Sequence, residues 1–219
     1  MLNLIPRFIH DKYRENSLQG DFECSALMID ITGFTGITDL LMERGKEGAE
    51  DVSELINRIY RPLIDSVYSG GGFITGFAGD GFTAIYPKTE DSNSALSALI
   101  TARQMQSTLQ KRNGSEKSLD PRYSITARIG ISRGRATWQI LGSSRKKTYL
   151  FAGDAIASCT NALKSCKPGD VLLDEKALSS IENEGSNALA DNGKSFASAH
   201  QGRVENSIVR RFVPDEVIH

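Results

Sequence analysis

Two aspartates and one glycine-containing turn are the residues of this sequence best suited to chemistry. Asp30 stands near the end of an apolar segment, residues 22–31, and just before a turn at residues 32–36. Asp80 stands in the Gly-Asp-Gly tripeptide at 79–81, between two short apolar runs, which is a strong signal for a β-hairpin. If these carboxylates converge without histidine or thiolate neighbours, they suit a hard, oxygen-preferring cation such as Mg²⁺.

The turn at residues 32–36 reads Thr-Gly-Phe-Thr-Gly and opens a segment with helical apolar spacing. Main-chain N–H groups at a helix N-terminus, aided by the helix dipole, form a site for anions. A metal-ligand pair beside such a site is expected for a magnesium–nucleoside triphosphate complex. Each aspartate also has a plainer interpretation, because aspartates often cap helices and Asp-Gly often serves only as a turn.

Composition limits the class of protein. The chain has 219 residues, with 26 Lys and Arg against 27 Asp and Glu, so we expect one domain without the basic excess that nucleic-acid binding needs. No apolar run approaches the ~20 residues of a membrane span, and the N-terminal residues do not resemble a signal peptide. Three cysteines without Cys-x-x-Cys spacing argue against a disulfide framework. These features favour a cytoplasmic protein.

Hydrophobic periodicity and turn residues predict alternating strands and helices. The predicted strands are residues 22–31, the two arms of a hairpin at 73–87, 124–131, 137–140, 147–151, 171–173 and 207–213. The predicted helices are 34–43, 46–68 with a kink or boundary at Pro62, 91–111, 154–164 and 175–181, and the predicted loops include 111–121 and 182–206. This order predicts an α/β (α+β) fold with a ferredoxin-like split βαβ core, a mixed antiparallel sheet flanked by helices. Trp138, Cys159 and Cys166 are expected to be buried.

Four segments resemble the catalytic domains of class III nucleotide cyclases. Residues 27–35 resemble the first metal motif of that family, and residues 77–84 resemble the second. Residues 128–134 are similar to its Arg-Val-Gly-Ile strand, and residues 149–157 to a later strand-to-helix turn. The similarity runs from residue 22 to residue 180, and the phrase Phe-Ala-Gly-Asp is most like the soluble adenylate cyclases. It implies an N-terminal extension at 1–21, a cyclase-like catalytic domain at 22–180, and a loop-rich segment with a last strand and linker at 181–219.

The resemblance also implies an activity and its site. Asp30 and Asp80, with the carbonyl of Ile31, would bind two Mg²⁺ or Mn²⁺ ions, and Asp30 and Asp80 would be the catalytic residues. The reaction would be the lyase step from ATP to 3′,5′-cyclic AMP and pyrophosphate. The triphosphate would be held by Thr32, Gly33, Phe34, Thr35, Gly36 and Arg128.

The sequence departs from the family where the purine base is read. Gly76 stands where adenylate cyclases usually carry a lysine, and Leu150 where they often carry an aspartate. Ala157 replaces the asparagine that orients the ribose, and the transition-state arginine would fall near Thr160 or Asn161. The metal half of a site is therefore present, and the base-reading half is missing.

Cyclase sites of this family form between two such domains, so the missing residues imply a need for a second cyclase-like domain, as a heterodimer or tandem partner. Loss of one transition-state donor typically costs ~10²–10³ in rate, so the isolated domain should be weak or inactive. ATP is favoured over GTP only by the resemblance. One alternative is a catalytically silent regulatory or dimerisation domain that binds a nucleotide or another small ligand. A diguanylate cyclase is less favoured, because residues 79–82 lack the paired acid of its hairpin.

Overall fold

The structure is a computed structural model that describes residues 5–90, 92–113, 124–143 and 145–188. These residues contain one sheet with the strand order β2-β3-β1-β4-β5, and β6 pairs with β4. The pairs are antiparallel except β4 with β6, which is parallel. The strands are β1 (Gln19–Thr32), β2 (Phe73–Ala78), β3 (Gly81–Pro87), β4 (Thr126–Gly142), β5 (Lys147–Ala152) and β6 (Val171–Leu173).

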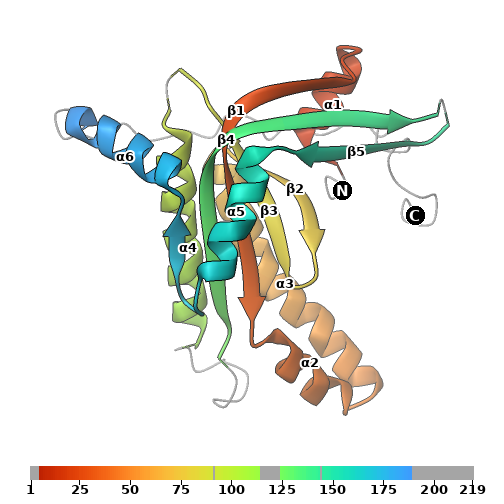
Figure 1. Ribbon diagram of the computed structural model, residues 1–219. Coiled ribbons are helices and arrows are strands. Elements are labelled where there is room, and N and C mark those ends of the chain that lie inside the picture. The colour runs from red at the N-terminus through yellow and green to blue at the C-terminus, as the bar shows by residue number, and fades with distance from the viewer. Residues whose placement is uncertain (1–4, 91, 114–123, 144, 189–219) are drawn as a thin grey trace.

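Helices cover both faces of the central strands. They are α1 (Arg7–Arg14), α2 (Phe34–Met42), α3 (Lys46–Ser69), α4 (Ser94–Asn113), α5 (Asp154–Ser165) and α6 (Glu175–Ala188). Figure 1 shows α5 on one face of the sheet and α3 and α4 on the other. Strand β3 lies between β1 and β2, which confirms the predicted split βαβ core. In the described residues, no helix combines the length and apolar character that crossing a bilayer needs.

Strand β1 is the centre of the core and carries Asp30 near its end. Leu27, Ile29 and Ile31 are buried in the cluster that includes α3 and α4, whereas Ala26 is buried in the cluster that includes α5. Because side chains alternate along a strand, Asp30 belongs to the α5 face. Burial on both faces explains why this strand reads as a nearly continuous apolar run.

The sequence predicted separate strands at 124–131 and 137–140, and this prediction is wrong because both segments belong to β4. The structure has one strand, because pairing with β1 continues without interruption from Thr126 to Gln139. No strand was predicted for residues 132–136, yet these residues stay extended and pair with β1.

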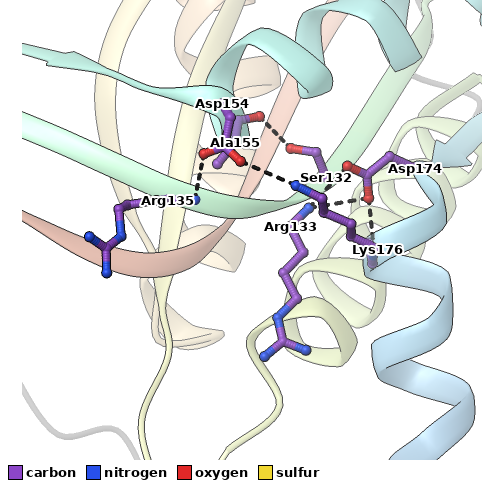
Figure 2. A network of polar contacts seen from close by, with 8 residues as sticks. Ser132, Arg133, Arg135, Asp154, Ala155, Asp174 and Lys176 are labelled. Carbon is purple, nitrogen blue, oxygen red and sulfur yellow. Dashed lines mark hydrogen bonds and ion pairs between the residues drawn. The ribbon is translucent and has the colours of Figure 1, made fainter.

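Two carboxylates complete the outer edge of β4 where no strand pairs with it. The edge bonds to β6 at residues 129–131 and to β5 from residue 137 onward. Between them, the N–H of Arg133 donates to Asp174 Oδ1 at 3.2 Å, and the N–H of Arg135 donates to Asp154 Oδ1 at 2.7 Å. Figure 2 shows both carboxylates beside this stretch of β4. These N–H groups have no strand partner on this side, so side chains substitute here for a missing strand.

Asp154 is also held by α6. Lys176 Nζ lies 3.3 Å from its Oδ2. The hydrogen bond from the Arg135 N–H, and then the contact with Lys176, keep the pKa of Asp154 below its ordinary value. Asp174 is likewise shared, because its Oδ1 accepts the N–H of Ala177 at 2.8 Å and so caps the start of α6.

Several element boundaries differ from the predictions. Helix α6 continues to Ala188, although a loop was predicted from residue 182, because the polar residues 182–188 contain no proline to end it. Helix α3 passes through Pro62 without ending. Helix α1 was not predicted; its Ile9 is fully buried beside Trp138. Trp138, Cys159 and Cys166 are buried, as predicted. The predicted strand 207–213 and most of the predicted loop 111–121 lie outside the described residues.

Candidate active site

The two aspartates lie at the same end of the sheet. Asp30 pairs with Gly81 across β1 and β3, so it stands beside the β2–β3 turn that carries Asp80. The N–H of Ile31 donates a hydrogen bond to the carbonyl oxygen of Asp80 at 3.1 Å. Main-chain pairing therefore fixes the hairpin turn against the end of β1, and both carboxylates are half-buried.

Gly81 makes this close approach feasible. A Cβ atom at this position would lie 2.2 Å from the carbonyl oxygen of Ile29, far inside van der Waals contact. The neighbouring Gly79 has φ +56°, the left-handed conformation that glycine adopts readily in turns. The Gly-Asp-Gly sequence thus lets the turn close and lets it press against β1.

Tyr60 of α3 is a residue beside the β2–β3 hairpin that sequence reasoning missed. Burial raises the pKa of its phenol, and the negative charges of Asp80 and Asp30 raise it further. The Tyr60 ring also contacts Phe77 of the hairpin, with centroids 6.5 Å apart. The apolar stripe of α3 predicts that Ile59 is buried, but it does not indicate that Tyr60 packs against the hairpin.

The predicted phosphate turn joins β1 to α2. Gly33 has φ +91°, and among the described residues no side chain caps the N-terminus of α2. The Thr32 hydroxyl lies 2.7 Å from the Thr126 hydroxyl, so it bridges to β4. Gly36 is exposed in the first turn of α2. The side chains of Phe34 and Thr35 lie outside the described part of the structure.

Arg128 contacts a carboxylate in the site. It stands opposite Asp30 in the β1–β4 register, and its Nε lies 3.1 Å from Asp30 Oδ2. Its Nη2 donates a second hydrogen bond to the same oxygen. The two side chains are 34% and 29% exposed, so the ion pair is only partly open to water.

The donor set fits a hard divalent cation. It consists of the Asp30 and Asp80 carboxylates and main-chain oxygen atoms such as that of Ile31. Within the described ranges, no group of three or more His, Cys, Asp and Glu side chains is arranged to hold a metal ion. Mg²⁺ is commonly bound in this way, through one or two carboxylates while substrate phosphates and water supply the remaining oxygens.

The positions without base-reading groups are all exposed but do not lie together in the single chain. Gly76 is on β2, Leu150 is on β5, and Ala157 is on α5. Strands β2 and β5 form opposite edges of the sheet. A Cβ atom at Gly76 would meet nothing within 4 Å, so a side chain at this position would have room.

A separate polar hollow of about 280 Å³ lies between the segment after β3, β4 and α6. None of the predicted site residues lines it. Its basic residues are Lys88, which pairs with Glu23, and Arg133, which donates to the Ser180 hydroxyl. The hollow is therefore separate from the candidate site at the Asp30–Asp80 end.

Comparison with known proteins finds adenylate cyclases among the relatives of this chain. No protein-family model matches the chain. An adenylate cyclase of Dictyostelium discoideum, described as terminal-differentiation specific, is 27% identical over 156 residues, which is 70% of this chain. Adenylate cyclase type 10 of Mus musculus is 26% identical over 158 residues, or 69% of this chain. The chain is a homologue of these adenylate cyclases.

Solved cyclase structures share the fold. The adenylyl cyclase CyaB from P. aeruginosa superposes with a TM-score of 0.60 at 18% identity, over 75% of this chain and 83% of that one. The guanylyl cyclase Cya2 gives a TM-score of 0.61 at 21% identity, over 74% and 80%. The predicted cyclase fold is thus confirmed. This cyclase homologue matches only 7% and 9% of the length of the two curated relatives.

Proposed function

We propose that this cyclase homologue supplies the metal- and triphosphate-binding half of an adenylate cyclase site, and that a second cyclase-like domain supplies the base-reading half. The product would be 3′,5′-cyclic AMP, with pyrophosphate released. The observation that carries the proposal is the meeting of Asp30 and Asp80 at one end of the sheet, tied by the Ile31–Asp80 hydrogen bond.

The residues of this half bind and orient the substrate. Asp30 and Asp80 provide anionic oxygens for the cations, and the N-terminus of α2 after Gly33 offers main-chain N–H groups to phosphate oxygens. Two bound Mg²⁺ ions would activate the ribose 3′-hydroxyl and neutralise charge on the triphosphate. The 3′-oxygen then bonds to the α-phosphorus as the bond to the bridging oxygen of pyrophosphate breaks, and the hydroxyl proton is released.

The choice of ATP and of a half-site rests on two further observations. The sequence relatives are named adenylate cyclases, whereas the solved neighbours include both adenylyl and guanylyl cyclases. Gly76, Leu150 and Ala157 present no group that can hydrogen-bond a purine or a ribose through a side chain. Two copies of this chain would therefore both lack the base-reading half.

Binding calorimetry with Mn²⁺ and a non-cyclising ATP analogue tests the metal half. We expect binding to the wild-type chain and loss of that binding in Asp30→Asn and Asp80→Asn. Asp65→Asn is the matched control, because Asp65 is an exposed aspartate on α3 and should leave binding unchanged. Absence of nucleotide binding at millimolar metal would contradict the proposal.

Mixing experiments test the half-site. The chain alone should form almost no cyclic AMP, whereas a complementary cyclase half that carries the lysine, asparagine and arginine should restore turnover. Asp30→Asn should abolish this restored activity. The missing base-reading groups also suit a second candidate, a silent regulatory domain, and nucleotide binding without turnover in any mixture would favour it. Ordinary turnover by the isolated chain would refute the half-site.

A further inference from the structure

The contact between Arg128 and Asp30 places a permanent cation on a carboxylate that we assign to metal binding. Both hydrogen bonds from the guanidinium end on Asp30 Oδ2. A carboxylate oxygen offers about two lone pairs, so this oxygen is saturated by Arg128. A divalent cation that binds through Oδ2, or through both oxygens of the carboxylate, must displace the guanidinium, and a cation on Oδ1 alone would still lie beside its positive charge.

We propose that Arg128 is an exchangeable counter-ion: it occupies Asp30 when the site is empty, and leaves that carboxylate when metal binds. The inference rests on the proposed function and adds to it. Arg128 then becomes available to phosphate oxygens, so one side chain neutralises the aspartate in the empty site and the triphosphate in the filled one. It is a positioning residue for the metal site.

The local structure supports such an exchange. Both partners lie on paired strands, so their main chains stay fixed while the long arginine side chain moves. The Thr32–Thr126 pair is the next same-face pair along these strands, toward the start of α2. A guanidinium that leaves Asp30 in the direction of the Thr32–Thr126 pair therefore moves toward the predicted phosphate turn. The partial exposure of both side chains leaves the route open to water.

The exchange predicts effects of opposite sign on two affinities. Removing the guanidinium frees Asp30, so Arg128→Gln should bind Mn²⁺ alone about tenfold more tightly, a change typical of losing a charged hydrogen bond. The same variant should bind the ATP analogue more weakly at saturating Mn²⁺. A residue that contacts only phosphate would leave the affinity for metal alone unchanged, and a purely structural residue would weaken both.

Arg135→Gln is the matched control. Arg135 forms another ion pair between β4 and β1, with Nη1 2.8 Å from Asp21 Oδ2, outside the candidate site. It should change neither affinity. Arg128→Lys keeps the charge but loses the paired donors, so its Mn²⁺ affinity should fall between those of the wild type and Arg128→Gln. Circular dichroism at each step verifies that the variants are folded.

A direct readout separates exchange from simple repulsion between cations. In the metal-free wild-type chain, the Arg128 Nε–H should be protected from solvent exchange in NMR spectra, identified by its absence in Arg128→Gln. Mg²⁺ alone should remove this protection. Mg²⁺ binding with the protection retained would overturn the exchange and leave the proposed function standing. Failure of the wild type to bind Mg²⁺ or Mn²⁺ at all would overturn both.

Discussion

Arg128 and Asp30 face each other across β4 and β1, and the arginine directs two donors at one carboxylate oxygen of the candidate metal site. Ion pairs with this degree of exposure contribute about 0–1 kcal/mol to stability. The pair therefore has a small structural role. Arg128→Gln should lower the free energy of unfolding by less than about 1 kcal/mol in urea titrations, and a larger loss would indicate a structural function for the pair.

Gly81→Ala should destabilise the hairpin and disturb the site together. The new methyl group would lie 2.2 Å from the Ile29 carbonyl oxygen, so β3 must move away from β1. We expect a loss of about 1–3 kcal/mol in the free energy of unfolding, as for other overpacked positions. Metal affinity should fall as well, because Asp80 follows the hairpin.

Gly76→Ala is the matched control for this prediction. It adds the same methyl group to the same hairpin, but nothing lies within 4 Å of it. Its unfolding and its metal affinity should stay close to those of the wild type. Equal losses in both variants would show that glycine flexibility, and not the contact with Ile29, controls the hairpin.

Tyr60 should report the charge of the site. Asp80 and Asp30 help to raise the pKa of its phenol, so Asp80→Asn should lower that pKa toward its ordinary value. Saturating Mg²⁺ should act in the same direction, since the cation offsets both carboxylates. The measurement is a tyrosinate absorbance titration, with Tyr60→Phe used to identify the signal. An unchanged Tyr60 titration in Asp80→Asn would show that the Asp80 charge does not reach the Tyr60 phenol.

Local signals explain what the sequence could predict. The apolar run before Asp30 and the Asp-Gly turn at Asp80 each specify an element within a few residues, and the split βαβ order then brings these elements together. The fold class and the convergence of the two aspartates follow from that combination.

The remaining features depend on contacts between distant segments. Asp30 and Arg128 are 98 residues apart, and only the β1–β4 register makes them partners. The contact of Tyr60 with the hairpin depends on how α3 is rotated about its axis against the sheet, which the sequence does not specify. The edge of the continuous β4 is completed by the carboxylates of Asp154 and Asp174, which come from later in the chain and lie beside residues for which no strand was predicted.

Asp174→Ala should destabilise both the edge of β4 and the start of α6. The carboxylate accepts the N–H groups of Arg133 and Ala177, so its removal leaves both donors without this partner. Loss of a helix cap costs about 1–2 kcal/mol, which thermal unfolding can measure. Asp174→Asn keeps an acceptor and should lose less. Glu175→Ala, at the next position, should change stability by only a few tenths of a kcal/mol.

Cys159 should make the protein sensitive to alkaline pH. Burial raises the pKa of its thiol from 9.0 to about 12, so the folded chain keeps the thiol protonated where the unfolded chain ionises it. The stability contributed by this group is complete below the unfolded pKa and is lost as pH rises toward the folded pKa. Between these values the free energy of unfolding should fall by about 1.4 kcal/mol per pH unit for this thiol.

Cys159→Ala isolates this contribution, because the comparison uses pH slopes and not absolute stabilities. The variant loses the Sγ contact with the Gly130 carbonyl and starts from a lower stability. Its denaturation midpoint should nevertheless fall less steeply with pH than that of the wild type between about pH 9 and pH 12. Cys24, whose pKa burial also raises to about 12, remains in both proteins and contributes equally to both slopes. Parallel slopes would show that Cys159 ionises in the folded chain, and hence that water reaches the interface between α5 and the sheet.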